Sequence, residues 1–159
     1  MNRHSPQKPF WKSPKRLLLW AVLAAFLIQF VPYGHAHTNP PVSGEPHWDS
    51  PQTAALVRRA CYDCHSNETT WPWYSHVAPV SWLVQSDVGG ARGRLNFTEW
   101  NRPQHDVNHI AAVVRSGHMP PWFFLPMHPE AHLTAGDRQA LIAGAAKTFG
   151  PQVPRGERH

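Results

Sequence analysis

The sequence predicts a small all-α domain of three or four helices, preceded by an N-terminal membrane segment. Two helix starts are indicated by side chains, Ser50 followed by Pro51 and Thr134 followed three residues later by Asp137. Apolar residues recur at helical spacing between residues 103 and 116, and almost no run alternates as a strand requires. A length of 159 residues allows one domain plus accessory segments.

The N-terminal part, residues 1–36, predicts a basic cap and a membrane anchor or signal peptide. Residues 17–31 are apolar except for Gln29, and Pro32 and Tyr33 can extend this segment to residue 33. We favour an uncleaved anchor in the inner membrane through residues 17–33, with the domain in the periplasm. Cleavage near Gly34-His35-Ala36 is the alternative and would give a soluble periplasmic protein.

The net charge of +5 does not indicate a nucleic-acid partner. Five of the 15 basic residues lie within residues 1–16, which leaves ten basic against 10 acidic residues in the rest of the chain. The excess is therefore a cap in front of the apolar segment, so no nucleic-acid binding is expected.

After residue 36 the sequence predicts a linker, a helical domain and a C-terminal tail. Residues 37–50 predict a proline-rich linker that lifts the domain off the membrane. The domain itself is expected over residues 51–150, with helices over about 51–62, from about 79, over 103–116 and from 135 to 149. Gly89, Gly90 and Gly93 make the end of the second helix ambiguous, and Gly117 ends the third. Residues 118–129 predict a rigid proline-dense loop, and residues 151–159 a disordered tail.

The motif Cys61-Tyr62-Asp63-Cys64-His65 carries the chemistry. Its Cys-x-x-Cys-His pattern is the signature of covalent c-type haem attachment, with His65 as the proximal iron ligand. The chain has only two cysteines, and both lie in this motif. Two other interpretations stay open: a structural zinc site completed by some of the 12 histidines, and a dithiol pair.

The distal side of a haem needs a second ligand, and Met119 is our first choice. It follows a helix stop and is held by Pro120 and Pro121. Met127 and His118 are the alternatives, as is an open position. Haem propionates would be neutralised by one or more of three arginines, namely Arg92, Arg94 and Arg102. The aromatic residues of the segment 71–74 either wall the cofactor or belong to the core.

A haem motif at the end of the first helix and a Met-Pro loop before the last helix resemble small class I cytochromes c. More specifically, residues 30–150 resemble the bacterial haem-binding domain family, through motifs that include His37-Thr38-Asn39-Pro40-Pro41, Ser66-Asn67-Glu68-Thr69, Trp71-Pro72-Trp73-Tyr74, Leu95-Asn96-Phe97 and Met119-Pro120-Pro121. The resemblance implies one covalent haem c on Cys61, Cys64 and His65, in a cytochrome c-like domain wrapped around it, and a retained anchor.

The function that these observations favour is a membrane-tethered cytochrome that carries single electrons on the periplasmic side, and not an enzyme. The expected partner is a redox protein that no motif identifies. The alternative is a haem-based sensor with an open sixth iron position. A zinc-stabilised interaction domain and a haem peroxidase are weaker alternatives.

Overall fold

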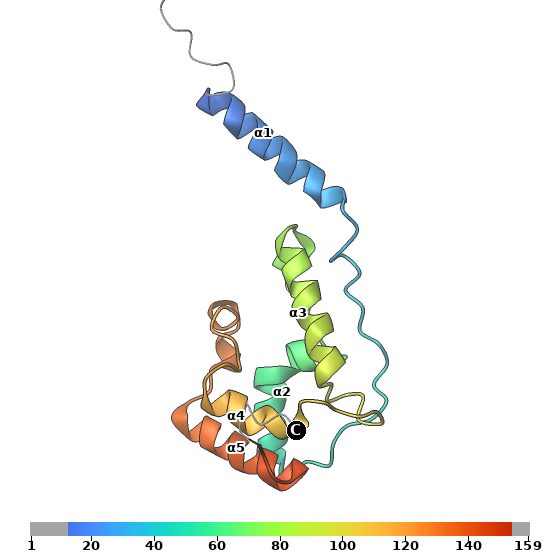
Figure 1. The fold of residues 1–159 in the computed structure, drawn as a ribbon, viewed down its shortest axis with the longest axis vertical. Helices are drawn as coiled ribbons and strands as arrows, with labels where there is room; N and C mark the ends of the chain where they lie inside the picture. The colour runs from blue at the N-terminus through green and yellow to red at the C-terminus, as the bar shows by residue number, and fades with distance from the viewer. Residues whose placement is uncertain (1–12, 154–159) are drawn as a thin grey trace, which may run out of the picture.

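The structure, a computed structural model, describes residues 13–153. Within this range it contains helices and turns and no β-strand, which confirms the predicted all-α class. Its α-helices are α1 (Pro14–Leu27), α2 (Pro51–His65), α3 (Val80–Arg94), α4 (Ile110–Arg115) and α5 (Ala135–Phe149). Figure 1 shows α2 to α5 gathered into one body, with α1 projecting from it. The basic residues of 1–12 and the tail residues 154–159 lie outside the described part.

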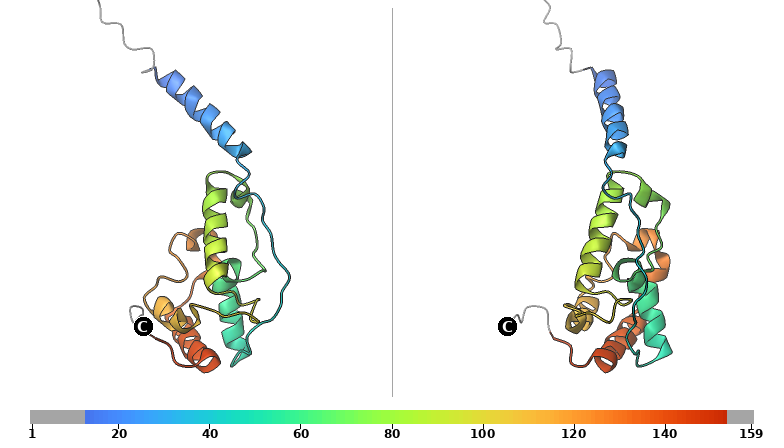
Figure 2. Two further views of the ribbon diagram at one scale, coloured as in Figure 1. Left: turned by 45° about the vertical axis from the view of Figure 1, so that its right-hand side comes forward. Right: turned by 90° about the vertical axis from the view of Figure 1, so that its right-hand side faces the viewer.

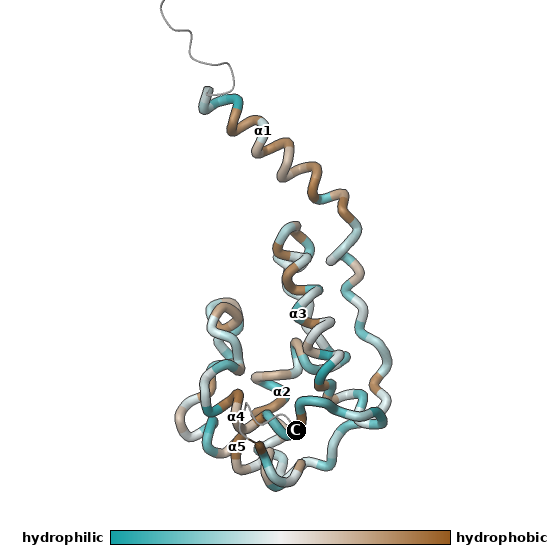
Figure 3. Tube along the Cα trace, in the orientation of Figure 1, coloured by the Kyte–Doolittle hydropathy of each residue, from teal (hydrophilic) through white to brown (hydrophobic). Residues whose placement is uncertain are grey.

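Helix α1 and the 3₁₀ turn η2 (Ile28–Phe30) form the N-terminal arm. No residue of α1 is buried, and its large apolar side chains are exposed. The hydropathy colouring in Figure 3 shows apolar residues along the length of α1. Among residues 13–153, no helix combines the length and the apolar character that crossing a membrane requires. The arm is joined to the domain by Gln29, whose side-chain amide bonds both the N–H and the carbonyl of Ala78 at 2.9 and 3.0 Å.

Helix α2 begins as the sequence predicts. The Ser50 hydroxyl accepts a hydrogen bond from the backbone N–H of Thr53 at 3.2 Å, and Pro51 occupies the first helical position. Such a cap contributes about 1 kcal/mol. The helix continues to His65, three residues beyond the predicted end at residue 62, so the whole Cys-x-x-Cys-His motif is helical.

Helix α5 begins with the predicted capping box. Thr134 accepts from the N–H of Asp137 at 3.1 Å, and the Asp137 carboxylate accepts from the N–H of Thr134 at 3.0 Å. The helix ends before Gly150, whose φ of 82° is in the left-handed region that favours glycine. Helices α2 and α5 meet at Gly144, where a Cβ atom would lie 2.1 Å from Oγ1 of Thr53. This close approach allows the two helices to enclose the core.

The core lies between α2, α4, α5 and the turn after α3. Phe97 is its largest fully buried side chain and stacks on Tyr62 and Trp100. The other buried apolar members are Leu56, Val57, Ala60, Leu95, Ile110, Val114, Leu133, Leu141 and Ala145.

The predicted third helix is shorter than expected. Over residues 103–116 the structure has only the 3₁₀ turn η4 (Val107–His109) and α4. The backbone N–H groups of His105 and Asp106 donate to the carbonyl of Arg94, at 2.9 and 3.3 Å, instead of entering a helix. Helix α3, in contrast, continues through all three of its glycines to Arg94.

The linker differs from the predicted spacer. Its first part, residues 37–44, is extended as expected but runs along the surface of the domain (Figures 1 and 2). The N–H of Ser43 donates to the Thr98 carbonyl at 2.9 Å, and the carbonyl of Gly44 accepts from Trp100 at 3.1 Å. We call residues 37–44 the strap. At the other end of the chain, Val153 donates to the carbonyl of Asn108 at 2.9 Å, so residues 151–153 are held on the domain rather than disordered.

Candidate functional site

The candidate site is the C-terminal end of α2. Because Cys61, Cys64 and His65 are three and four residues apart on one helix, they lie on the same face. Both cysteines are free thiols and are partly buried. Burial raises the pKa of each thiol to about 12, so both are protonated at neutral pH. They are therefore not activated thiolates of the kind that redox-active dithiols use.

The imidazole of His65 has a fixed orientation. Its Nδ1 donates a hydrogen bond to the carbonyl of Leu95 at 3.0 Å. Burial lowers the pKa of His65, while hydrogen bonding to the carbonyls of Leu95 and Ala91 opposes this shift. The ring is thus held neutral with its proton on Nδ1, which leaves the lone pair of Nε2 for a metal ion.

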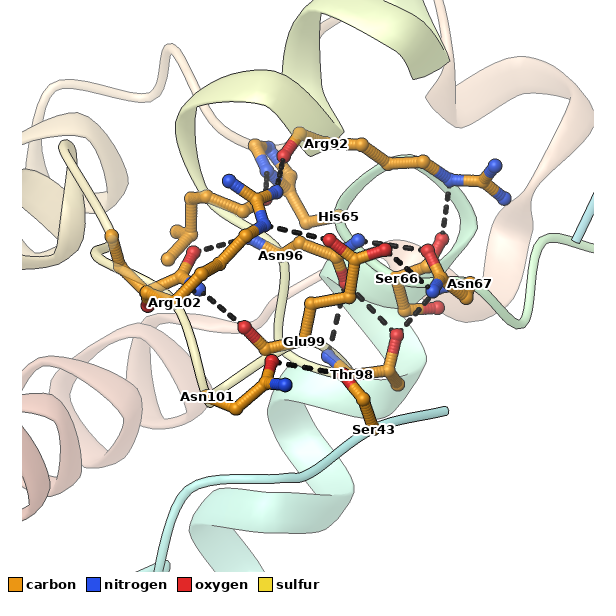
Figure 4. A network of polar contacts seen from close by, with 12 residues as sticks. Ser43, His65, Ser66, Asn67, Arg92, Asn96, Thr98, Glu99, Asn101 and Arg102 are labelled. Carbon is orange, nitrogen blue, oxygen red and sulfur yellow. Dashed lines mark hydrogen bonds and ion pairs between the residues drawn. The ribbon is translucent and has the colours of Figure 1, made fainter. Parts of the chain in front are cut away.

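A buried polar network holds the segment after the motif against the turn after α3 (Figure 4). The N–H of Phe97 donates to the His65 carbonyl at 2.8 Å. The side chain of Asn67 accepts from Asn96 at 2.8 Å, and its backbone N–H donates to Thr98 at 2.6 Å. Asn67, Asn96 and Thr98 are each at most 3% exposed. These bonds fix the distance between α2 and Leu95, and hence the position of the His65 ring.

The three arginines considered for haem propionates have partners within the protein. Arg92 donates to the carbonyls of Ser66 and Thr38 at 2.7 and 2.8 Å. Arg102 forms a 2.6 Å ion pair with Glu99 and also donates to the Arg92 carbonyl. Arg94 pairs with Asp106 at 2.6 Å, and its side chain is 72% exposed. Arg92 and Arg102 therefore act as links of the network in Figure 4.

A second polar cluster surrounds the motif residue Asp63. The ring of His128, which is only 8% exposed, lies with Nδ1 3.6 Å from the Asp63 carboxylate and 3.2 Å from the Glu130 carboxylate. Its Nε2 is 2.8 Å from the Tyr74 hydroxyl, and Phe124 stacks on the ring with centroids 3.7 Å apart. This cluster joins the 3₁₀ turn η3 (Trp73–His76) and the loop after α4 to the haem motif. No sequence pattern singles out His128, because two of its partners, Asp63 and Tyr74, come from distant segments of the chain.

One comparison with known proteins identifies the family of the chain. A model of the haem-binding domain family matches residues 23–147, which include the whole motif. The chain belongs to this family. No match was found among curated proteins or among solved structures. The family match supports haem as the cofactor of this haem-binding domain and confirms the family predicted from the sequence.

The side chains around the motif suit a haem. The donor set contains two thiols and one oriented imidazole, as a c-type haem requires. Four large apolar side chains of η3, α3 and the loop after α4 are exposed and offer surface that a flat apolar cofactor can cover: Trp73 at 74%, Leu83 at 65%, Trp122 at 81% and Phe123 at 56%. Trp73 is thus not a core residue, which was one of the two interpretations of the segment 71–74.

The candidate distal ligands lie in the loop between α4 and α5. Met119 is partly buried, and its backbone N–H donates to the Val113 carbonyl at 3.1 Å. His118 is exposed, with Nδ1 2.8 Å from the Ser116 hydroxyl, and Met127 is 56% exposed. The structure brings Cys61, Cys64 and His65 together in α2, while the role of Met119 stays a prediction.

Proposed function

We propose that this haem-binding protein is a c-type cytochrome, with one haem attached covalently to Cys61 and Cys64 and ligated by His65. The observation that carries the proposal is the single helix face on which two free thiols adjoin an imidazole whose Nδ1 is held by Leu95. A zinc site would need further ligands around the thiols, whereas the haem proposal uses every donor that this face offers.

Each motif residue has a defined part in this proposal. Cys61 and Cys64 would hold the haem covalently, the sulfur of each bonding to one vinyl carbon and the thiol proton going to the other carbon of that vinyl group. The Leu95 carbonyl orients the His65 ring and increases the basicity of Nε2 toward the iron. Bound haem supplies reversible transfer of a single electron between the ferric and ferrous states, and no catalytic side chain is needed for it.

We assign the distal position to Met119. Two features support the assignment: its backbone is tied to α4 through Val113, and two prolines follow it. A thioether held in this way favours ferrous iron and raises the reduction potential. Such six-coordinate iron suits an electron carrier, whereas a sensor needs a position that an external ligand can take.

We further propose that residues 17–33 attach the protein to the inner membrane and that the haem domain works in the periplasm, where it exchanges electrons with a redox partner. The exposed apolar side chains of α1 support membrane contact. The two hydrogen bonds between Gln29 and Ala78 support a domain held close to that membrane.

The proposal is tested on full-length protein produced together with cytochrome c maturation proteins. The pyridine haemochrome spectrum of the denatured protein should show haem with both vinyl groups saturated. Cys61→Ala and Cys64→Ala should each shift this spectrum toward a haem with one free vinyl group. His65→Ala should change the native spectrum, whereas His47→Ala, at an exposed histidine, should not. Wild-type protein without covalent haem would contradict the proposal.

Carbon monoxide tests the distal ligand. The reduced wild-type protein should bind carbon monoxide poorly, and Met119→Ala should bind it readily, because the substitution opens the iron. Met127→Ala is the matched control and should resemble the wild type. Rapid binding by the wild type would reject Met119 as the ligand and favour the sensor.

A further inference from the structure

We propose that Asp63, His128 and Glu130 form a binding site for a divalent transition-metal ion of the zinc type, separate from the haem iron. One atom from each residue, the imidazole Nδ1 and two carboxylate oxygens, lies within 4.8 Å of the other two. Ligands about 2.0–2.2 Å from a tetrahedral zinc ion are about 3.3–3.6 Å apart. The distances of 3.6 and 3.2 Å from Nδ1 of His128 to the two carboxylates already suit this geometry, and a small movement of the carboxylates toward each other would complete the site.

The histidine of this site has the surroundings of a metal ligand. The Nε2 of His128 lies 2.8 Å from the Tyr74 hydroxyl. With a metal ion on Nδ1, the proton lies on Nε2 and is donated to the hydroxyl oxygen, and such a hydrogen bond fixes the tautomer and the ring orientation of a metal-bound histidine. Stacking on Phe124 fixes the plane of the ring, so that Nδ1 is directed at the two carboxylates.

The carboxylate of Asp63 is held in a fixed orientation as well. One oxygen of Asp63 accepts from the N–H of Thr70 at 3.1 Å, while the other faces His128. Asp63 also lies in the last turn of α2, where the helix dipole disfavours negative charge. A bound cation would offset this repulsion.

Charge balance gives an independent argument. Within residues 13–153, the ion pairs of Asp63 and Glu130 involve only His128, and neither carboxylate pairs with a lysine or arginine. Even a protonated His128 leaves one negative charge uncompensated. One imidazole nitrogen with two carboxylate oxygens suits zinc better than calcium, which prefers oxygen ligands alone.

The test measures zinc in EDTA-treated full-length protein after equilibrium dialysis at a series of free zinc concentrations. Iodoacetamide is added first, so that no cysteine without haem can bind zinc. The wild type should bind a single zinc ion per chain at this site. Tyr74→Phe should weaken binding by about tenfold or more, and Glu130→Gln by at least as much. Two controls at exposed residues, Glu68→Gln and His132→Gln, should leave binding unchanged.

Two results would overturn the site: zinc binding by the wild type no tighter than by Glu130→Gln, or an equal loss in Glu68→Gln. Covalent haem is measured on the same samples from the pyridine haemochrome spectrum. The zinc result is therefore separate from the proposed function, and either proposal can fail without the other.

Discussion

Replacing Gly144 by alanine tests whether the crossing of α2 and α5 limits the stability of the domain. A Cβ atom at residue 144 would lie 2.1 Å from Oγ1, 2.7 Å from Cγ2 and 2.9 Å from Cβ of Thr53. Rotation of the Thr53 side chain moves Oγ1 and Cγ2 but not Cβ. The helices themselves must therefore separate, which disturbs the buried residues Leu141 and Ala145 beside the crossing.

The change in the free energy of unfolding that Gly144→Ala causes is the sum of two opposing effects. Overpacking of a core costs about 1–3 kcal/mol, and the upper part of this range applies because backbone must move. Alanine stabilises a helix interior by about 1 kcal/mol relative to glycine. We therefore expect Gly144→Ala to lower the free energy of unfolding by about 2 kcal/mol, and the melting temperature of a domain of this size by roughly 10 °C.

The assay is urea unfolding of haem-loaded full-length protein, followed by circular dichroism. Gly90→Ala in α3 is the matched control, since a Cβ atom there meets no atom within 4 Å. It should stabilise the protein by about 0.5–1 kcal/mol. Adding Thr53→Ala to Gly144→Ala should restore part of the loss, because the two shortest contacts disappear. Equal stabilisation by Gly144→Ala and Gly90→Ala would refute the reasoning.

Three further predictions concern the polar contacts. Asn67→Ala should destabilise the protein by about 2–3 kcal/mol in urea unfolding, because its buried partners lose their bonds; Asn101→Ala, outside the buried part of the network, should have a much smaller effect. Glu99 has a lowered pKa, because its carboxylate accepts from Asn67 and pairs with Arg102. The stability that the Glu99 carboxylate contributes is complete above the pKa of this group in the unfolded chain, and it is lost as pH falls through its lower pKa in the folded protein. In the wild type the urea midpoint of unfolding should therefore fall below about pH 4.5, and Glu99→Gln should make this fall smaller. Thr134→Ala should remove about 1 kcal/mol, measured in the same way, by breaking the capping box.

A steeper acid dependence in Glu99→Gln than in the wild type would contradict the assignment of its ion pair. Unchanged stability of Asn67→Ala would show that water replaces its side chain. A Thr134→Ala protein as stable as the wild type would mean that packing alone fixes the start of α5.

The elements predicted correctly are those encoded by adjacent residues. Ser50-Pro51 and Thr134 with Asp137 start helices through local hydrogen bonds, so the sequence is sufficient to locate them. The residues that form the haem motif are also adjacent, and the family match supports the cofactor that they predict.

The elements that were not predicted depend on contacts between distant residues. Residues 103–106 leave the helical pattern, and the N–H groups of His105 and Asp106 donate to the Arg94 carbonyl instead. Arg92 likewise donates hydrogen bonds to the Ser66 carbonyl and to the Thr38 carbonyl of the strap, and no periodicity in the sequence indicates these partners. The same holds for His128, which lies 65 residues after Asp63 and needs the complete fold to reach it.

The strap determines how short an expressed fragment can be. Arg92 donates to the Thr38 carbonyl and to the side-chain oxygen of Asn39, and the Asn67 side-chain amide donates to the carbonyl of Pro41. A fragment that starts at the first helix of the domain, at residue 51, has α2 to α5 but lacks these three acceptors. A fragment that starts at residue 37 keeps them. We therefore expect an isolated domain that begins at residue 37, fourteen residues before its first helix, to be more stable than one that begins at residue 51, and crystallisation or spectroscopy of the domain should use that boundary.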